Sequence, residues 1–271
     1  MNDTRRTFLK AGIVLAVAAI LDAFWFESFF IETNEFDRRK SPGGREGLKV
    51  VQISDLHLNS IRWQHKRLAQ KVNDLKPDLL VFTGDAIDKA GNLELLNTFL
   101  GLLDRNIKKA AITGNWEYWG NIDLEKLRSV YFDHNCDLLI NDTTQYVIRG
   151  ETISVTGVDD YVGGRADIEL ALENYRESSR HIILNHCPGY YDSIIAKSPK
   201  QVQTDLILAG HTHGGQINIF GLIPFLPQGS GRYVKGWYEG GYADMYVSRG
   251  IGTSVLPVRF GARAEVAVFT I

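Results

Sequence analysis

The sequence predicts an α/β protein built as a two-sheet α/β sandwich, and three observations support this fold class. Five short apolar runs each end in a polar residue, which is typical of buried strands that reach one edge of a sheet. Helix-like stretches separate the first three runs, as in βαβ units. More apolar runs follow in the second half of the chain, whose 271 residues suffice for one large α/β domain.

Residues 1–31 are predicted to be a targeting segment that precedes the folded domain. Thr4-Arg5-Arg6-Thr7-Phe8-Leu9-Lys10 is followed by the apolar stretch 11–21. Paired arginines before a modest apolar run resemble a twin-arginine export signal, so we expect the export machinery of that route as a partner. A Sec-type signal or a plain anchor is the alternative. Either one places the remaining chain across a membrane.

The sequence is compatible with cleavage of this segment and with its retention as a membrane anchor. Residues 16–19 are small, but no clear cleavage site stands before a polar mature start. Residues 11–31 reach the roughly 20 residues of a spanning helix, although Asp22 and Glu27 interrupt them. Residues 32–47 are polar and include Pro42-Gly43-Gly44, which predicts a linker to a domain over residues 48–271.

The five apolar runs supply the predicted strands. The runs and their polar ends are 48–54 before Asp55-Leu56-His57, 79–83 before Gly84-Asp85, 110–113 before Gly114-Asn115, 182–185 before His186, and 206–209 before Gly210-His211-Thr212-His213. The stretches 64–75 and 93–103 are expected to be helices. Because open α/β sheets bind ligands beyond the carboxyl ends of their strands, the polar ends should meet at one rim.

Three later runs, 152–156, 245–248 and 264–271, are expected to be further strands. A Gly-rich region separates the last two, so we expect them to pair antiparallel. The two cysteines, Cys136 and Cys187, are expected to be small buried residues, with one disulfide as the alternative.

The polar residues at the strand ends predict a metal centre. They are Asp55, His57, Asp85, Asn115, His186, His211 and His213. A single Asp or His at such a place is usually structural, so the prediction rests on the whole set. The Asp-x-His and His-x-His pairs place two donors on the same side of an extended backbone. Mixed carboxylate, amide and imidazole donors suit Mn, Fe or Zn better than Ca or Mg.

These residues, in this order, resemble the five motifs of the calcineurin-like metallophosphoesterase superfamily, over about residues 48–271. Gly214-Gly215-Gln216 and the segments 248–252 and 256–259 are similar to its membrane-associated bacterial branch. That branch includes the YaeI and YkuE phosphodiesterases and the LpxG-type UDP-2,3-diacylglucosamine hydrolases. Purple acid phosphatases carry a Tyr where this chain has Asp88, so a tyrosinate-bound ferric site is not implied.

The resemblance implies a dinuclear site and assigns its ligands. One ion would be held by Asp55, His57, Asp85 and His213, and the other by Asp85, Asn115, His186 and His211. Asp85 would bridge the ions, and a hydroxide shared between them would attack phosphorus, so Asp85, Asn115 and His186 would act through it. Two ions stabilise the attacking and leaving oxygens of an in-line displacement. We expect manganese, with iron, zinc or a mixed pair as alternatives.

The segment Gly114-Asn115-Trp116-Glu117 departs from the superfamily. Most members have His after the ligand Asn, close to the leaving group, and this chain has Trp116. An indole N–H is a donor that does not titrate, so the general acid is missing. That loss typically costs about 10²–10⁴-fold in rate. Glu117, Arg165 or Arg249 could assist, and Trp116 itself is expected to pack in the wall of the site.

The substrate is expected to be a phosphodiester or pyrophosphate, with a phospholipid or a nucleotide-activated lipid favoured. The apolar loop 217–227 follows the last ligands and could hold an acyl chain or touch a bilayer. A soluble nucleotide or phosphomonoester, or a metal-holding scaffold without turnover, are the alternatives. The net charge of −2 indicates no general affinity for nucleic acid. We expect a monomer on the outer face of the cytoplasmic membrane.

Overall fold

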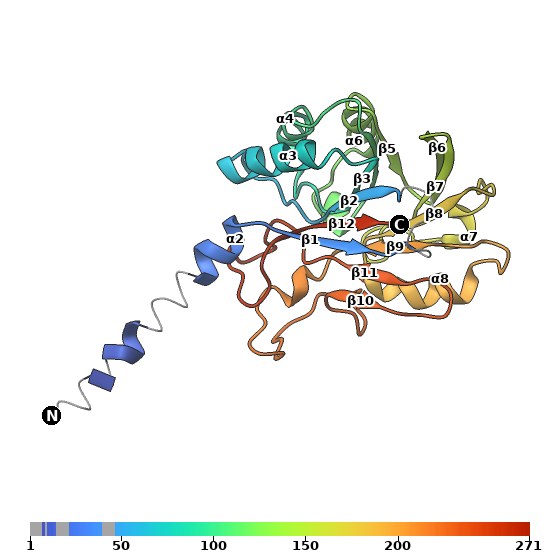
Figure 1. Cartoon of the computed structure of the whole chain (residues 1–271). Helices are drawn as coiled ribbons and strands as arrows, with labels where there is room; N and C mark the ends of the chain where they lie inside the picture. Colours follow the sequence, from blue (N-terminus) through green and yellow to red (C-terminus); the bar gives the residue numbers. More distant parts are fainter. Residues whose placement is uncertain (1–6, 9, 15–21, 40–46) are drawn as a thin grey trace.

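The computed structural model describes residues 7–8, 10–14, 22–39 and 47–271 (Figure 1). Arg5 and Arg6 of the export motif, and residues 15–21 of the apolar stretch, lie outside the described residues. Within the described part of the chain, no helix combines the length and the apolar character that crossing a membrane requires.

Two six-stranded sheets pack face to face and form the predicted sandwich (Figure 1). The first sheet contains, in spatial order, β1 (Glu32–Asp37), β12 (Glu265–Thr270), β2 (Lys49–Ile53), β3 (Leu79–Thr83), β4 (Lys108–Ile112) and β5 (Cys136–Leu139). The second contains β10 (Gly236–Tyr238), β11 (Met245–Val247), β9 (Leu206–Ala209), β8 (Arg180–Asn185), β7 (Glu151–Gly157) and β6 (Asp142–Ile148). The central strands β2 to β5, and likewise β7, β8, β9 and β11, pair in parallel.

Helices cover the outer faces of both sheets (Figure 1). The first sheet carries α3 (Trp63–Leu75), α4 (Leu93–Leu100) and α6 (Leu124–Phe132), and the second carries α7 (Ile168–Ala171) and α8 (Tyr191–Lys197). Two short helical segments, Asp22–Phe26 and α2 (Glu27–Phe29), precede β1, and α5 (Asn115–Trp119) follows β4. The predicted helices over 64–75 and 93–103 correspond to α3 and to α4, which is shorter than expected. Both cysteines are buried and free, which confirms the prediction for them.

The strands are apolar on both faces because both faces are buried. Val50 and Val81 point into the core between the two sheets, whereas Val51 and Leu80, the neighbouring positions, point toward the helices on the outer face. All four side chains have no exposed surface. The continuous Val/Ile/Leu runs of the sequence are therefore the expected signature of a parallel sheet covered on both sides.

The chain from Glu32 to Asp37 corrects one expectation. Its polar sequence predicted a linker, but these residues form β1, which pairs in parallel with β12 from Glu32 opposite Glu265 to Asp37 opposite Thr270. Phe36 packs against Tyr246 and Phe269, with ring centroids 4.9 and 5.6 Å apart. Backbone pairing with β12 and this one aromatic side chain hold the strand in the sheet, which explains why its composition gave no strand signal.

The predicted antiparallel pairing of the last two strands is also wrong. β11 lies in the second sheet beside β9 and β10. β12 lies in the first sheet between β1 and β2. The Gly-rich connection between them crosses from one sheet to the other instead of turning back as a hairpin, and it passes the rim where the predicted ligands lie.

Candidate metal centre

The predicted ligands follow the carboxyl ends of β2, β3, β4, β8 and β9 and meet at one rim of the sandwich. All of them are at most 4% exposed. Several have left-handed backbone conformations directly after their strands, with φ of 52° at Asp55, 45° at His57, 53° at Asp85, 73° at His211 and 51° at His213. Such conformations cost about 1–3 kcal/mol each and persist at functional sites, where the surrounding structure enforces them.

One half of the cluster contains Asp55, His57, Asp85 and His213. The Nε2 atoms of His57 and His213 lie 3.1 Å apart. An oxygen of Asp55 lies 3.7 Å from His213 Nε2, and an oxygen of Asp85 lies 3.7 Å from His57 Nε2. The ligand atoms of Asp55, His57 and His213 all fall within 4.8 Å of one another, so they can share one cation.

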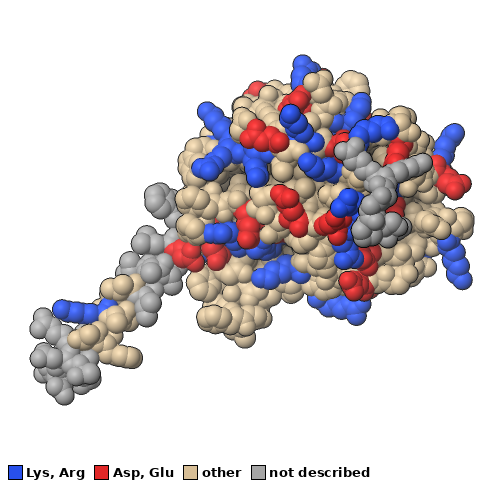
Figure 2. Space-filling view, viewed as in Figure 1, with Lys and Arg blue, Asp and Glu red and all other residues tan. Residues whose placement is uncertain are grey.

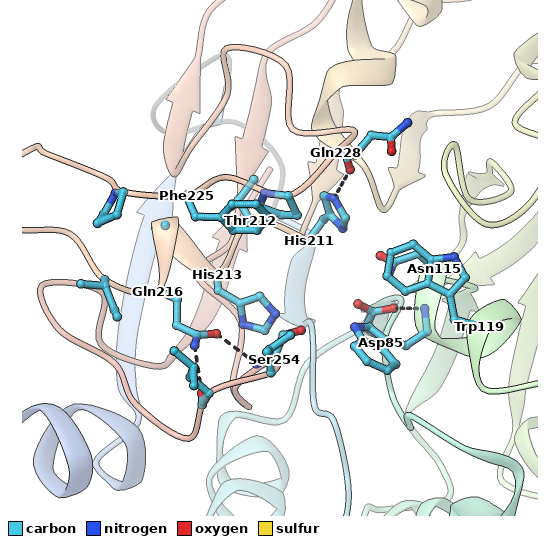
Figure 3. A pocket seen from close by; sticks show the side chains of 17 residues that line it. Asp85, Asn115, Trp119, His211, Thr212, His213, Gln216, Phe225, Gln228 and Ser254 are labelled. Carbon is cyan, nitrogen blue, oxygen red and sulfur yellow. Dashed lines mark hydrogen bonds between the residues drawn. The ribbon is translucent and has the colours of Figure 1, made fainter.

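The other half contains Asp85, Asn115, His186 and His211. His186 Nε2 lies 3.3 Å from an Asp85 oxygen, 3.3 Å from Asn115 Oδ1 and 3.2 Å from His211 Nδ1. Figure 3 shows Asp85, Asn115, His211 and His213 around the same pocket. Asp85 faces both halves, as a bridging ligand would.

The donor chemistry of this cluster fits two divalent ions. In each half, imidazole nitrogens face one another at 3.1–3.2 Å with buried carboxylate oxygens beside them. A cation bound between these nitrogens would replace the contacts that they make with one another, and the carboxylates beside them would balance its charge. Imidazole and carboxylate are the donors that Mn, Fe and Zn accept in proteins.

Outer contacts orient three of the four imidazoles. His57 Nδ1 lies 2.5 Å from Asp88 Oδ1, His186 Nδ1 lies 2.7 Å from the Thr83 carbonyl oxygen, and His211 Nε2 lies 2.7 Å from the Gln228 carbonyl oxygen. A proton on each of these nitrogens leaves the other ring nitrogen free to bind a metal. No local sequence pattern points to this role of Asp88, because its contact with His57 depends on a fold that brings two loops together.

The two carboxylates differ in their electrostatic surroundings. Burial raises the pKa of Asp55 above its ordinary value. Burial acts on Asp85 in the same direction, but the charge and hydrogen bond of His186, together with the charges of His57 and His211, outweigh it and hold the pKa of Asp85 below its usual range. Asp85 is therefore the carboxylate that the site itself keeps ionised.

Glu117 supports the loops that carry the ligands and does not reach into the site. It is 1% exposed, and its carboxylate accepts hydrogen bonds from the backbone N–H groups of Asp85, Ala86 and Gly114 at 2.7–3.0 Å. Burial, with the charge of Asp85, raises the pKa of Glu117 to about 7. Because both oxygens are occupied by the backbone, its suggested role in assisting the leaving group is not supported.

Trp116 lies in the wall of the pocket, as expected from the sequence. Its ring centroid is 6.1 Å from that of His57 and 5.6 Å from that of Trp119. Its backbone N–H donates to an Asp85 oxygen at 2.9 Å. The position where the resemblance would place a catalytic His therefore contributes an apolar surface here, plus one backbone hydrogen bond to Asp85.

Two arginines after β11 have structural roles that the sequence did not reveal. Arg249, suggested as a substrate contact, is paired with Glu265 at 2.6 Å and Glu32 at 2.8 Å. Arg259 has no exposed surface; it donates to the carbonyl oxygens of Arg249 and Ala262 at 2.8 Å and lies 3.2 Å from His213 Nδ1. Arg259 thus stabilises the connection between β11 and β12 next to the predicted ligand His213.

The comparison with known families agrees with this geometry. Residues 48–215, which include every predicted ligand, match the family model described as calcineurin-like phosphoesterase. The chain belongs to this family. It is a metallophosphoesterase, a hydrolase of a family that depends on two metal ions.

Relatives of this metallophosphoesterase align over nearly the whole chain. A Bacillus subtilis protein named as the uncharacterized metallophosphoesterase YkuE is 32% identical over 99% of this chain and 97% of its own length. An uncharacterized metallophosphoesterase from Aquifex aeolicus is 31% identical over 94% of this chain and 97% of its own length. Among solved structures, a dimetal phosphatase from Danio rerio superposes with a TM-score of 0.51 at 12% identity, covering 83% of this chain and 99% of that chain. This likeness concerns the fold alone.

Proposed function

We propose that this metallophosphoesterase hydrolyses a phosphodiester or pyrophosphate bond in a lipid-linked substrate at a membrane surface. A nucleotide-activated lipid such as UDP-2,3-diacylglucosamine, or a phospholipid, has the required chemistry. We infer that this chain acts as the members of the membrane-associated bacterial branch of the superfamily do. The observation that carries it is the pocket beside the metal-ligand cluster.

The pocket joins a polar floor to apolar walls. It has a volume of about 550 Å³, and Asp85, His211 and His213 line it together with Trp116 and Trp119 (Figure 3). Its outer wall is formed by loop residues, among them Phe225, Val255 and Leu256, which are 75%, 89% and 54% exposed. Exposed apolar side chains around a pocket mark a site for an apolar ligand. An acyl chain would cover them while the phosphoryl group lies on the polar floor.

The residues of the site have different roles in the proposed hydrolysis. Two divalent cations held by the cluster would supply Lewis acidity and a water of lowered pKa. Asp85, whose pKa is held low, faces both halves of the cluster, and the outer contacts of His57, His186 and His211 orient their metal-facing nitrogens. The apolar wall with Trp116 excludes water from the leaving-group side and offers no titrating proton donor. This arrangement favours a leaving group that is already stable as an anion, such as a nucleotide phosphate.

The membrane location and export route are part of the same proposal. The arginine pair and apolar stretch of residues 1–31 support delivery by the twin-arginine route to the outer face of the cytoplasmic membrane. A relative from Bos taurus, 29% identical over 98% of this chain and 63% of its own length, is named a transmembrane protein with metallophosphoesterase domain. We propose manganese as the bound metal and a monomer as the oligomeric state.

The test compares substrates on the full chain, because β1 and the segments before it belong to the fold. The protein with Mn²⁺ is assayed on UDP-2,3-diacylglucosamines of increasing acyl length, on bis-p-nitrophenyl phosphate and on p-nitrophenyl phosphate. We expect kcat/KM to rise with acyl length, since each buried CH₂ contributes about 0.8 kcal/mol. A rate independent of acyl length would favour the soluble-nucleotide alternative. No turnover of any ester would favour the scaffold alternative.

Paired variants separate the apolar wall from the chemistry. Phe225→Ser with Leu256→Ser should lower kcat/KM for the longest acyl substrate by about 10–100-fold, as expected for losing two apolar contacts. The same variant should change bis-p-nitrophenyl phosphate hydrolysis less than about threefold. Phe132→Ser, which removes a side chain that is 74% exposed on α6, is the matched control and should leave both rates unchanged.

A further inference from the structure

A second surface of the molecule, distinct from the metal pocket, combines exposed aromatic rings with a run of basic side chains. It comprises α2, the residues next to it, and the exposed face of α3. We call it the α2–α3 face and define it by Phe26, Phe30, Arg62, Trp63, Lys66, Arg67 and Lys71. Figure 1 places it where the N-terminal segment leaves the domain.

The aromatic part of the α2–α3 face is ordered by contacts and yet open to solvent. The rings of Phe29 and Phe30 lie 6.5 and 6.1 Å from the ring of Trp63, and the rings of Phe26 and Phe30 lie 4.8 Å apart. Phe26, Phe30 and Trp63 nevertheless remain 45%, 47% and 50% exposed. Clustered, partly exposed aromatic rings are typical of protein surfaces that lie at the interface between membrane and water.

The basic part follows directly along α3. Its exposed side chains include Arg62, Lys66, Arg67 and Lys71, and no acidic residue occurs before Asp74. Among the described residues, no ion pair joins these four side chains to a carboxylate. Figure 2 shows Lys and Arg side chains gathered over the region of α3. The whole chain has a net charge of −2, so this face is a local excess of positive charge on an otherwise slightly acidic protein.

The two parts meet at a small groove between the N-terminal segment and α3. The groove has a volume of about 230 Å³, and it is lined by Phe29 and Phe30 of the N-terminal segment and by Trp63, Arg67 and Lys71 of α3. Aromatic rings beside basic side chains can hold the glycerol and phosphate parts of a phospholipid headgroup.

From this geometry we propose that the α2–α3 face docks on a bilayer and binds the headgroups of anionic phospholipids. Charge complementarity selects this occupant, because each Lys or Arg near an anionic leaflet contributes to binding. Continuity with the N-terminal segment supports it, since the face lies beside the point where the chain would leave the bilayer. The proposal rests on the membrane location proposed above, but not on the identity of the substrate.

The test places a fluorophore on the face of the full chain. Gln70 is exposed on α3, and the native Cys136 and Cys187 are buried, with burial raising the pKa of each thiol, so Gln70→Cys is labelled selectively with an NBD group. The labelled chain is reconstituted in vesicles of phosphatidylcholine with a rising fraction of phosphatidylglycerol. We expect NBD emission to move to shorter wavelength as phosphatidylglycerol increases, and to return on adding 0.5 M salt. No change with phosphatidylglycerol would overturn the proposal.

Charge variants decide whether the basic residues cause the response. Arg67→Glu with Lys71→Glu should lower the docked-to-undocked ratio by at least about 25-fold, since each basic residue contributes about fivefold. Arg67→Gln with Lys71→Gln, a milder change, should lower it in the same direction. The matched control, Arg176→Glu with Lys200→Glu, reverses two exposed basic residues elsewhere and should dock like the wild type. A full response in the α3 variants, or its loss in the control, would refute the assignment.

Two further measurements separate the outcomes. Bis-p-nitrophenyl phosphate hydrolysis should stay within about twofold of wild type in every variant, because the α2–α3 face contains no metal ligand. If hydrolysis is absent even in the wild type, the proposed function fails while the docking measurement still stands. An equal NBD response to heparin without vesicles would show a general polyanion site and overturn the lipid proposal.

Discussion

At the scale of single residues, Trp116 sets how this enzyme must handle its leaving group. The indole forms part of the pocket wall near His57 and cannot give up a proton. We therefore expect wild-type kcat/KM to fall steeply as the pKa of the leaving group rises. Trp116→His should recover up to about 10²-fold on alkyl phosphodiesters and change little on p-nitrophenyl esters.

The control for this prediction is Trp116→Phe, which keeps an aromatic ring without adding a titrating group. It should retain the steep dependence of the wild type. A shallow wild-type dependence would mean that another group donates the proton, and the claim that the site lacks a general acid would be wrong.

His181 gives a pH prediction away from the metal centre. It lies at the start of β8, where its Nε2 and Nδ1 are 2.8 and 3.0 Å from the hydroxyls of Thr156 and Thr204. Burial lowers the pKa of His181 to about 4, from 6.5 for an exposed imidazole. Between these values the unfolded chain binds a proton that the folded chain excludes. Stability therefore is complete above pH 6.5 and falls as the pH drops toward 4.

The magnitude can be checked by urea unfolding at pH 7.5 and at pH 5. His181 should account for about 2 kcal/mol of the loss in unfolding free energy between these two values. His181→Gln keeps hydrogen-bonding groups but does not titrate. The variant should therefore lose about 2 kcal/mol less unfolding free energy than the wild type between pH 7.5 and pH 5. Equal pH dependence in the two proteins would count against a neutral buried His181.

At the scale of elements, β1 is the strand whose contribution is easiest to isolate. Phe36 supplies its main apolar contact, with Trp237, Tyr246 and Phe269 around the ring. Phe36→Ala should lower the unfolding free energy by about 2–4 kcal/mol, because it leaves a gap at a partly buried site. Glu35→Ala on the exposed side of the same strand should change it by less than about 0.5 kcal/mol. Chemical denaturation of both variants measures the difference.

The same strand shows what the sequence can and cannot reveal about elements. Apolar runs such as those of β2 and β3 are visible because both of their faces are buried, and their polar ends place the ligand residues at the rim. β1 has no such run, since its place depends on pairing with β12 far along the chain. Asp88, Glu117 and Arg259 were missed as supporting residues for the same reason: each has a partner in a distant segment, His57, Asp85 and His213 respectively, and no local pattern encodes that contact.

At the scale of the whole molecule, the metal centre should couple to global stability, because its ligands come from both sheets. Without cations, the imidazole nitrogens crowd one another at 3.1–3.2 Å and the buried carboxylates lose the charge of the two ions. Removal of metal with a chelator should lower the melting temperature, and added Mn²⁺ should restore it in proportion to RT ln(1 + [L]/Kd). For a chain of this size, each kcal/mol of stabilisation by bound metal raises the melting temperature by about 2–4 °C.

The control is Asp85→Asn, which weakens the ligand that faces both halves. Its melting temperature should respond less to chelator and to Mn²⁺ than that of the wild type. Scanning calorimetry at fixed pH and ionic strength gives both values. Identical melting of the wild type with and without metal would contradict the assignment of this cluster as a metal centre.

The position of β12 between β1 and β2 has a consequence for how the protein is made. β12 fills the gap between β1 and β2, so the first sheet cannot close while β12 is still inside the ribosome. Until then, the edges of β1 and β2 that later pair with β12 lack their partner, and unpaired edges invite association with other chains. Pairing so distant in sequence is also slow to form. A nascent chain of this enzyme is therefore exposed to association with its neighbours until β12 has emerged and paired.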